Sequence, residues 1–419
     1  MNLSVRWRLS AMMFLEYAIW GAWSVVAGKS FQDMGFNGNQ MGWIFSLLPL
    51  ATIITPFFGG QIADRYLNTE KFLAILHLIG GAVMLALATQ TSYHMIVVLM
   101  LIYSLFYAPT LALTNSITFH HLTSSEREFG GIRVGGTVGW VAAGWILALW
   151  RWGVGHPIPG DLFYLAGILS ILLGLFCFCL PKTPPKREGA NPLAFVEALV
   201  LLKNFDFLFF IIISFVVGTE LQFYYMLTPQ FLAAPTHFGG IGLSENSLSF
   251  VMSVAQIAEF SVMLSLPFFL LRLGVRKTLV VGILAWPIRY AIFAFLPIAW
   301  LVIPALALHG FCYVFFFVVG FIYVDKVAPA DIRASAQSLV ALVVLGMGSF
   351  VGSKFAGYIQ NIYTKTLHPA IIWHNVTVNQ VTNWHLVFLI PCALTVACAI
   401  IFPLLFHERQ TAAPEVQGA

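Results

Sequence analysis

Residues 161–181 read DLFYLAGILSILLGLFCFCLP, and residues 182–188 continue as KTPPKRE. The first stretch carries a single charged residue, Asp161. It is long enough to cross the hydrocarbon core of a bilayer, which takes about 20 apolar residues in a helix. The second stretch is polar and contains two adjacent prolines, which oppose the continuation of a helix. The contrast predicts a membrane-spanning helix that ends in a polar connection.

The composition extends this prediction to the whole chain. Of 419 residues, 59% are hydrophobic and 9% are charged, whereas soluble domains carry roughly 25% charged residues. The 38 phenylalanines and 12 tryptophans suit lipid-facing surfaces and the membrane interfaces. The lipid bilayer is therefore the expected surrounding of most of the chain. No basic run interleaved with aromatic residues indicates a nucleic-acid partner.

The same length criterion predicts twelve spanning helices, six on each side of the polar connection. The first six lie near residues 8–28, 41–63, 71–90, 94–119, 132–152 and 161–181. The second six lie near residues 206–232, 245–271, 277–296, 299–323, 334–362 and 383–406. The expected fold is therefore all-α. It consists of an N-terminal six-helix bundle (1–181), a linker (182–205), a C-terminal six-helix bundle (206–406) and a tail (407–419).

The distribution of Lys and Arg predicts the orientation. If the N-terminus is cytoplasmic, the outside loops hold little beyond Lys29, Arg151 and Lys365, and the inside loops hold a roughly fivefold excess of positive charge. Both termini, the linker and the tail are then cytoplasmic. Similar local sequences, such as Ile132-Arg133 and Ile332-Arg333, recur at equivalent places in the two halves. This recurrence suggests a duplicated unit, as in many transporters.

Ionisable residues within the predicted spans are functional candidates, because a charge at membrane depth must face a cavity or a partner. They are Glu16, Arg133, Glu220, Glu259, Arg289 and Lys354, with His309 as a weaker case. So many such groups predict a hydrated central cavity.

One candidate stripe combines Arg133, Thr137 and Trp140, at positions i, i+4 and i+7 of a helix. This spacing places them on one face. The stripe could bind a planar polar solute, with Trp140 as the stacking surface. Alternatively, Arg133 lies near the membrane interface and Trp140 packs between helices.

A second stripe pairs Gln256 with Glu259 at i and i+3. A low-dielectric cavity disfavours the charged form of a carboxyl group, so Glu259 could take up a proton on one side and release it on the other. The alternative is a structural ion pair with Arg289 or Lys354.

A third pair, Gln222 and Tyr225, also shares a helical face. Glu220 points about 200° away from Gln222, so we expect Glu220 to be an interhelical anchor. The tandem His120-His121 has no histidine one turn away, so no metal site is expected.

Several segments carry a resemblance to a known family. The loop Gly59–Arg65 resembles the signature loop of the major facilitator superfamily. Five further segments are similar to the bacterial nucleoside:proton symporter family of that superfamily: YAPTLALTNSI (107–117), IRVGGTVGW (132–140), GTELQ (218–222), QIAE (256–259) and IRASAQ (332–337). The resemblance runs through essentially the whole chain.

This resemblance implies a proton-coupled nucleoside importer of the bacterial inner membrane that works by alternating access. It places the substrate site at Arg133, Thr137, Trp140, Gln222, Tyr225, Gln256, Glu259, His309 and Tyr313. Trp140 and Tyr313 replace phenylalanines of the family pattern, Tyr225 replaces an asparagine and His309 replaces a tyrosine. We expect a monomer that uses no cofactor, with the proton as the coupling ion.

Val314 is a larger departure, because it replaces an aspartate of the family pattern. A valine can neither carry a proton nor accept a hydrogen bond from a solute hydroxyl. Glu259 is then the main candidate for proton coupling, and Glu16 is a second titratable group.

Two other functions remain to be weighed. One is a related carrier for another small polar solute, such as a sugar or a modified nucleoside, with or without proton coupling. The other is a membrane-embedded enzyme, which is disfavoured because the sequence has no paired aspartate motif, no His-Glu-x-x-His and no nucleophile elbow.

Overall fold

The computed structural model describes residues 3–57, 67–123, 125–184, 194–329, 331–373 and 376–407. The signature-like loop Gly59–Arg65 lies outside the described residues. The first half of the chain forms α1 (Leu3–Ser24), α2 (Ala27–Asp33), α3 (Gly38–Ile54), η1 (Thr55–Phe57), α5 (Thr69–Leu87), α6 (Tyr93–His121), α7 (Ser125–Val154), α8 (Asp161–Phe176) and η2 (Cys177–Cys179).

The second half is also mainly helical. Its elements as far as residue 295 are α9 (Ala194–Glu197), η3 (Ala198–Lys203), α10 (Phe205–Gln222), η4 (Phe223–Leu227), α11 (Thr228–Ala233), η5 (Thr236–Phe238), η6 (Glu245–Ser247) and α12 (Leu248–Phe295). They are followed by α13 (Ala299–Ala305), α14 (Leu308–Cys312), η7 (Tyr313–Val318), α15 (Val319–Val327), α16 (Arg333–Ala341), η8 (Leu342–Gly348), α17 (Ser349–Ile362), β1 (Thr364–Trp373), β2 (Val376–Thr382) and α18 (Trp384–Leu405).

Within the described residues, ten helical stretches are long and apolar enough to cross a membrane. Their bounds agree closely with the sequence predictions; for example, α6 spans Tyr93–His121 and the predicted span was 94–119. Two predicted spans, 245–271 and 277–296, fall in the single helical run α12. Gly274 interrupts that run with a φ of 71°, a conformation that glycine adopts without steric cost.

Local sequence explains where several helices begin. Asn37 caps α3 by accepting a hydrogen bond from the backbone of Gln40, whose side chain returns a bond to the backbone of Asn37. Asn204 caps α10 in a similar way, by accepting from the backbone N–H groups of Asp206 and Phe207. Such caps satisfy N–H groups that have no partner inside the helix.

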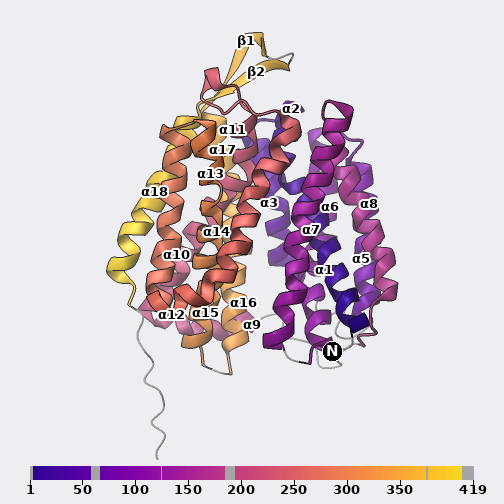
Figure 1. Ribbon diagram of the computed structural model, residues 1–419, viewed down its shortest axis with the longest axis vertical. Helices are drawn as coiled ribbons and strands as arrows, with labels where there is room; N and C mark the ends of the chain where they lie inside the picture. Colours follow the sequence, from indigo (N-terminus) through magenta and orange to yellow (C-terminus); the bar gives the residue numbers. More distant parts are fainter. Residues whose placement is uncertain are drawn as a thin grey trace, which may run out of the picture.

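A short hairpin is the one departure from an all-helical chain among the described residues. Strand β1 pairs antiparallel with β2, with Thr364 opposite Thr382, and projects beyond one end of the helices (Figure 1). The sequence prediction left residues 363–382 as a connection between spans. The alternation of valine and threonine in Val376–Thr382 was the available signal, because β-branched residues favour strands.

The helices of the two halves lie on two sides of the molecule. Figure 1 shows α5, α6, α7 and α8 on one side and α10, α12, α15 and α18 on the other. Contacts between the halves are present at the hairpin end. There, Lys29 forms an ion pair with Glu245 at 2.7 Å, and the Trp145 indole N–H donates to Ser253 Oγ at 3.0 Å.

The same end includes a close approach between α3 and α17. A Cβ atom on Gly42 would lie 2.7 Å from the backbone oxygen of Ser353, closer than real Cβ atoms come to an oxygen. Gly42 therefore allows the backbones of the two halves to touch here.

Candidate functional site

The predicted site residues come from both halves of the chain. Arg133, Thr137 and Trp140 lie on α7, Gln222 ends α10, Tyr225 lies in η4, Gln256 and Glu259 lie on α12, His309 lies on α14 and Tyr313 begins η7. Gln256 and His309 are buried, and the other seven are half-buried. Partial exposure of polar side chains in the middle of apolar helices is what a solute-accepting surface requires.

On the first half, α1 contributes to the α7 stripe. The Arg133 guanidinium lies 3.9 Å from the centroid of the Tyr17 ring. The Trp140 ring meets the Trp20 ring edge-on, with centroids 5.2 Å apart. Trp140 thus uses part of its surface for packing, and its indole N–H has no hydrogen-bond partner within the described structure. The sequence reasoning missed Tyr17, although it follows Glu16 and lies three residues before Trp20.

On the second half, Glu259, His309 and Tyr225 form a cluster. The Glu259 side chain is 21% exposed, and its Oε2 lies 4.0 Å from Nε2 of His309. The Tyr225 hydroxyl lies 3.5 Å from the same ring nitrogen. These groups belong to α12, α14 and η4, so helices far apart in sequence bring them together.

The two clusters carry opposite charges, Arg133 on α7 and Glu259 on α12. A Coulomb attraction acts between Arg133 and Glu259, and both charges also act on Tyr313. Opposite charges carried by opposite halves thus share one region. A polar solute that binds there would contact both halves at once.

The remaining predicted residues lie along the same helices. Gln222 accepts a hydrogen bond from Ser353 Oγ at 3.3 Å, which links α10 to α17. Gln256 lies one turn before Glu259. Tyr225 and Tyr313 both lie in π-helical turns, η4 and η7. Such turns interrupt helices frequently at functional sites.

Val314 follows Tyr313 in η7, and its side chain is fully buried. The position that carries an aspartate in the family pattern is thus part of the apolar packing here.

Glu16 lies in a different environment. It is fully buried; its Oε1 accepts a hydrogen bond from Thr110 at 2.7 Å and its Oε2 lies 2.9 Å from Nε2 of His77. The other ring nitrogen of His77 lies 3.3 Å from Ser170 Oγ. Both carboxylate oxygens are therefore engaged within the first half, where they join α1, α5 and α6. Its role in proton coupling remains a prediction.

The alternative ion pairs of Glu259 are not found in the described structure. The Arg289 guanidinium lies over the rings of Tyr224, Trp286 and Tyr290. The Lys354 ammonium lies 3.1 Å from the centroid of the Trp43 ring. Aromatic faces attract cations, so both cations are held by rings in place of the Glu259 carboxylate.

Glu220 does not anchor helices through its carboxyl group in this structure. It is fully buried, but neither carboxyl oxygen has a hydrogen-bond partner among the described residues. Only its backbone oxygen is engaged, by the Tyr290 hydroxyl at 2.6 Å.

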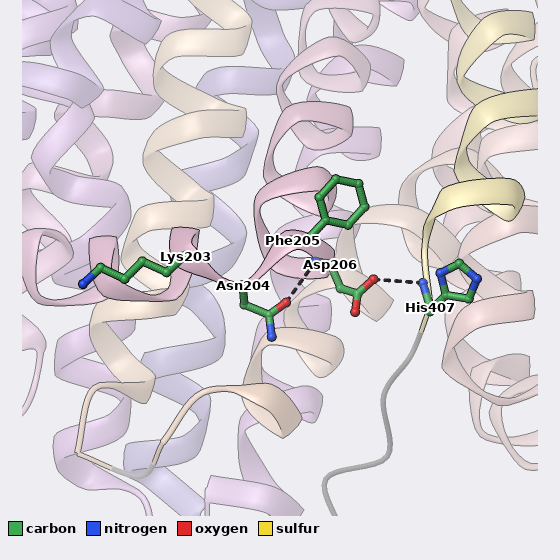
Figure 2. Close-up of a pocket in the computed structure, with 5 residues that line it drawn as sticks. All are labelled: Lys203, Asn204, Phe205, Asp206 and His407. Atoms are coloured by element: carbon green, nitrogen blue, oxygen red, sulfur yellow. Dashed lines mark hydrogen bonds between the residues drawn. The ribbon is translucent and has the colours of Figure 1, made fainter.

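A separate hollow of about 720 Å³ lies at the start of α10, away from these residues. Figure 2 shows its lining by Lys203, Asn204, Phe205, Asp206 and His407. The Asp206 carboxylate accepts from the backbone N–H of His407 at 3.2 Å. Helix capping and the docking of the chain after α18 account for these contacts.

Groupings of side chains that bind metal ions are absent from the described residues. No three or more His, Cys, Asp or Glu side chains there are grouped so that they could hold a metal ion.

Comparison with known proteins shows relatives over nearly the full length. A sequence profile of the family described as "Nucleoside H+ symporter" matches residues 1–411. YegT of Escherichia coli (strain K12) is 35% identical over 415 residues, covering 96% of this chain and 93% of YegT. The nucleoside permease NupG of the same organism is 30% identical over 430 residues, covering 99% of this chain and 98% of NupG.

Solved structures support the same relationship. The crystal structure of the nucleoside transporter NupG superposes with a TM-score of 0.82 at 29% identity and covers 97% of this chain and 99% of NupG. A D-xylose-proton symporter shares the fold at 12% identity, with a TM-score of 0.69 over 96% of this chain and 98% of that one. The resemblance in the sequence motifs is thereby confirmed: the chain is a multi-pass membrane transporter that belongs to the nucleoside H+ symporter family.

Proposed function

We propose that this protein imports nucleosides across the bacterial inner membrane by alternating access, together with protons. The observation that carries the proposal is that both halves hold half-buried polar groups on their apolar helices: Arg133 beside Tyr17 in the first half, and Glu259 with His309 and Tyr225 in the second. A nucleoside offers a planar base for stacking and hydroxyl groups for hydrogen bonds. Trp140 and the polar side chains nearby present the matching surfaces.

Two six-helix bundles, residues 1–181 and 206–406, are the proposed moving units, joined by the linker 182–205. Twelve spans follow if α12 counts as two: its 48 residues would extend about 70 Å as a straight helix, more than twice the thickness of the hydrocarbon core. The break at Gly274 lies where the two predicted spans meet. Helix α3, whose 17 residues are mostly apolar, is continued by η1 and supplies the remaining span.

The distribution of contacts supports one state of an alternating-access cycle. The ion pair Lys29–Glu245, the hydrogen bond Trp145–Ser253 and the close approach at Gly42 all join the halves at the hairpin end. With cytoplasmic termini, as the positive charges favour, this end is extracellular. The proposed state is therefore closed to the outside.

The main test is uptake of radiolabelled uridine by cells that express the full chain and lack other nucleoside transporters. Uptake that a protonophore abolishes would support a symporter. Uptake that equilibrates uridine and resists the protonophore would support an uncoupled facilitator, the alternative that the buried Val314 favours. If the cells take up sugars but none of a panel of nucleosides, the transported solute is a sugar and the proposed substrate class is wrong.

Arg133→Ala is expected to abolish uptake while the amount of protein in the membrane stays unchanged, because it removes the positive charge that the first half presents beside Tyr17 and Trp140. Arg272→Ala is a matched control: Arg272 is exposed and lies over the Phe268 ring on α12. Uptake by Arg133→Ala at the level of the control would remove Arg133 from the site.

A further inference from the structure

Arg289 is a buried cation whose charge is held by aromatic rings. Its side chain is fully buried in the second half. The guanidinium lies 4.4 Å from the Tyr224 ring centroid, 4.6 Å from that of Trp286 and 5.1 Å from that of Tyr290. No carboxylate of the described residues lies within ion-pair distance of it. The rings fix the position of the guanidinium and leave its N–H groups free to act on a neighbour.

That neighbour is His309. Nη1 of Arg289 lies 3.4 Å from Nδ1 of the imidazole, a long hydrogen bond. A guanidinium has donors only, so the ring nitrogen that faces it must be the acceptor. A proton on Nδ1 would set two donors, and in the imidazolium two positive charges, against each other. This contact is satisfied only if Nδ1 is unprotonated, which places the single hydrogen of a neutral ring on Nε2.

Nε2 of His309 faces the candidate site. It lies 3.5 Å from the Tyr225 hydroxyl and 4.0 Å from Glu259 Oε2. The ring is stacked on Tyr224 with centroids 4.7 Å apart and nearly parallel planes, at 18°. Tyr224 thus holds the plane of the imidazole, and Arg289 holds the direction of its hydrogen.

We infer that Arg289 is a positioning residue for solute recognition: it fixes His309 as a neutral imidazole that donates from Nε2. The solute that this arrangement takes has a hydrogen-bond acceptor facing His309 and a donor facing the Glu259 carboxylate. The distance of 4.0 Å to Glu259 is too long for a hydrogen bond, and the contact with the Tyr225 hydroxyl at 3.5 Å is a long one. Because His309 is fully buried, a solute acceptor must displace the Tyr225 hydroxyl to take the Nε2 hydrogen. This inference rests on the proposed function for the use of the donor, but the state of the imidazole is independent of it.

The first experiment reads the imidazole directly. The purified full-length chain, labelled with ¹⁵N at histidine, is examined by NMR without solute, and His309→Gln assigns the resonances of His309. The wild type is expected to show a protonated Nε2 and an unprotonated Nδ1. In Arg289→Met the donor is lost, so the resonances are expected to move towards a mixture of tautomers, whereas Arg289→Lys keeps a donor and the wild-type state.

His77 serves as an internal control in the same spectra, because Glu16 and Ser170 hold it within the first half. Its resonances should be the same in all variants, which separates a local change from misfolding. A proton on Nδ1 of His309 in the wild type, or an imidazolium, would overturn the inference even if Arg289→Met does not fold. So would an unchanged spectrum in folded Arg289→Met.

The second experiment measures uptake kinetics. In Arg289→Met only the fraction of His309 that carries its hydrogen on Nε2 can donate to the solute, so the KM for uridine is expected to rise by the inverse of that fraction, about twofold for an even mixture. Arg289→Lys should recover most of the affinity. An unchanged KM in a variant whose tautomer has shifted would overturn the role in recognition. If the wild type takes up no nucleoside, the proposed function fails while the spectra still decide the state of His309.

Discussion

Each half of the molecule buries one glutamate on its first long helix, and the two glutamates have opposite surroundings. Glu16 on α1 and Glu220 on α10 are both fully buried. In each case a tyrosine hydroxyl donates to the glutamate's own backbone oxygen, Tyr107 at 2.8 Å and Tyr290 at 2.6 Å. Only the Glu16 carboxyl group has partners, namely Thr110 and His77. The Glu220 carboxyl group has none among the described residues.

The comparison teaches that burial alone does not assign a role to an intramembrane carboxyl group. A buried charge is tolerated where polar partners compensate the lost hydration, and it is costly where they are missing. Glu16 has the surroundings of a structural residue. Glu259, which is partly exposed and is attracted by the opposite charge of Arg133, has those of a functional one.

The largest effect on transport is expected at Glu259, where a substitution should remove accumulation without unfolding the protein. Glu259→Gln is expected to abolish accumulation of nucleoside against a gradient, because the amide cannot carry the coupled proton. Exchange of labelled for unlabelled nucleoside, which needs no net proton movement, should persist and serves as the control. If the variant still concentrates solute, the coupling role belongs to another group.

Glu16→Ala is expected to lower the free energy of unfolding by about 3–5 kcal/mol, because it leaves His77 buried without its partner. The measurement is the thermal unfolding of the purified protein in detergent. Uptake per folded molecule should change little. A stable variant with no accumulation would instead give Glu16 the role in coupling.

Trp140 tests the aromatic surface of the first half. Trp140→Ala is expected to weaken nucleoside binding by about 1–3 kcal/mol, the range found when a base loses a stacked aromatic side chain. Trp140→Phe should transport normally, because it keeps a ring. Equal transport by the two variants would show that Trp140 only packs against Trp20.

Glu220→Gln is expected to have the smallest effect. Since the carboxyl group has no partner to lose in the described structure, the variant should match or exceed the wild-type stability, within about 1 kcal/mol. Glu16→Gln is the matched substitution in the first half and should be clearly destabilising. Strong destabilisation by Glu220→Gln would mean that Glu220 gains a partner elsewhere in the transport cycle.

Much of the fold could be predicted, and the reason is local. Whether a segment crosses a membrane depends on its own length and apolarity, so the predicted span 383–406 nearly coincides with α18, Trp384–Leu405. The pairing of β1 with β2 was not predicted, because a strand pair depends on contacts between two segments and not on the length and apolarity of one. The sequence predicts two spans, 245–271 and 277–296, but it does not show that both belong to one helical run that is interrupted at Gly274.

The candidate site was predicted in part. Spacing along α7 and α12 placed Arg133 with Trp140 and Gln256 with Glu259, because neighbours on one helix follow from the helical period. The alternative for Glu259, an ion pair with Arg289 or Lys354, could not be decided from the sequence, because it depends on which helices face each other; the pair is absent from the described structure. Tyr17 and Tyr224 were missed for the same reason: each acts through a contact with another helix.

The sequence by itself determined that the chain is a helical membrane transporter, which family it belongs to and which polar residues lie within its long apolar helices. Only the tertiary structure decided what those residues meet. It joins Glu16 to His77, 61 positions away, leaves Glu220 without a partner among the described residues, and turns one nitrogen of His309 towards Arg289. The physical reason is that the energy of a buried charge depends on atoms within a few ångströms, and helix packing, more than position in the chain, supplies those atoms.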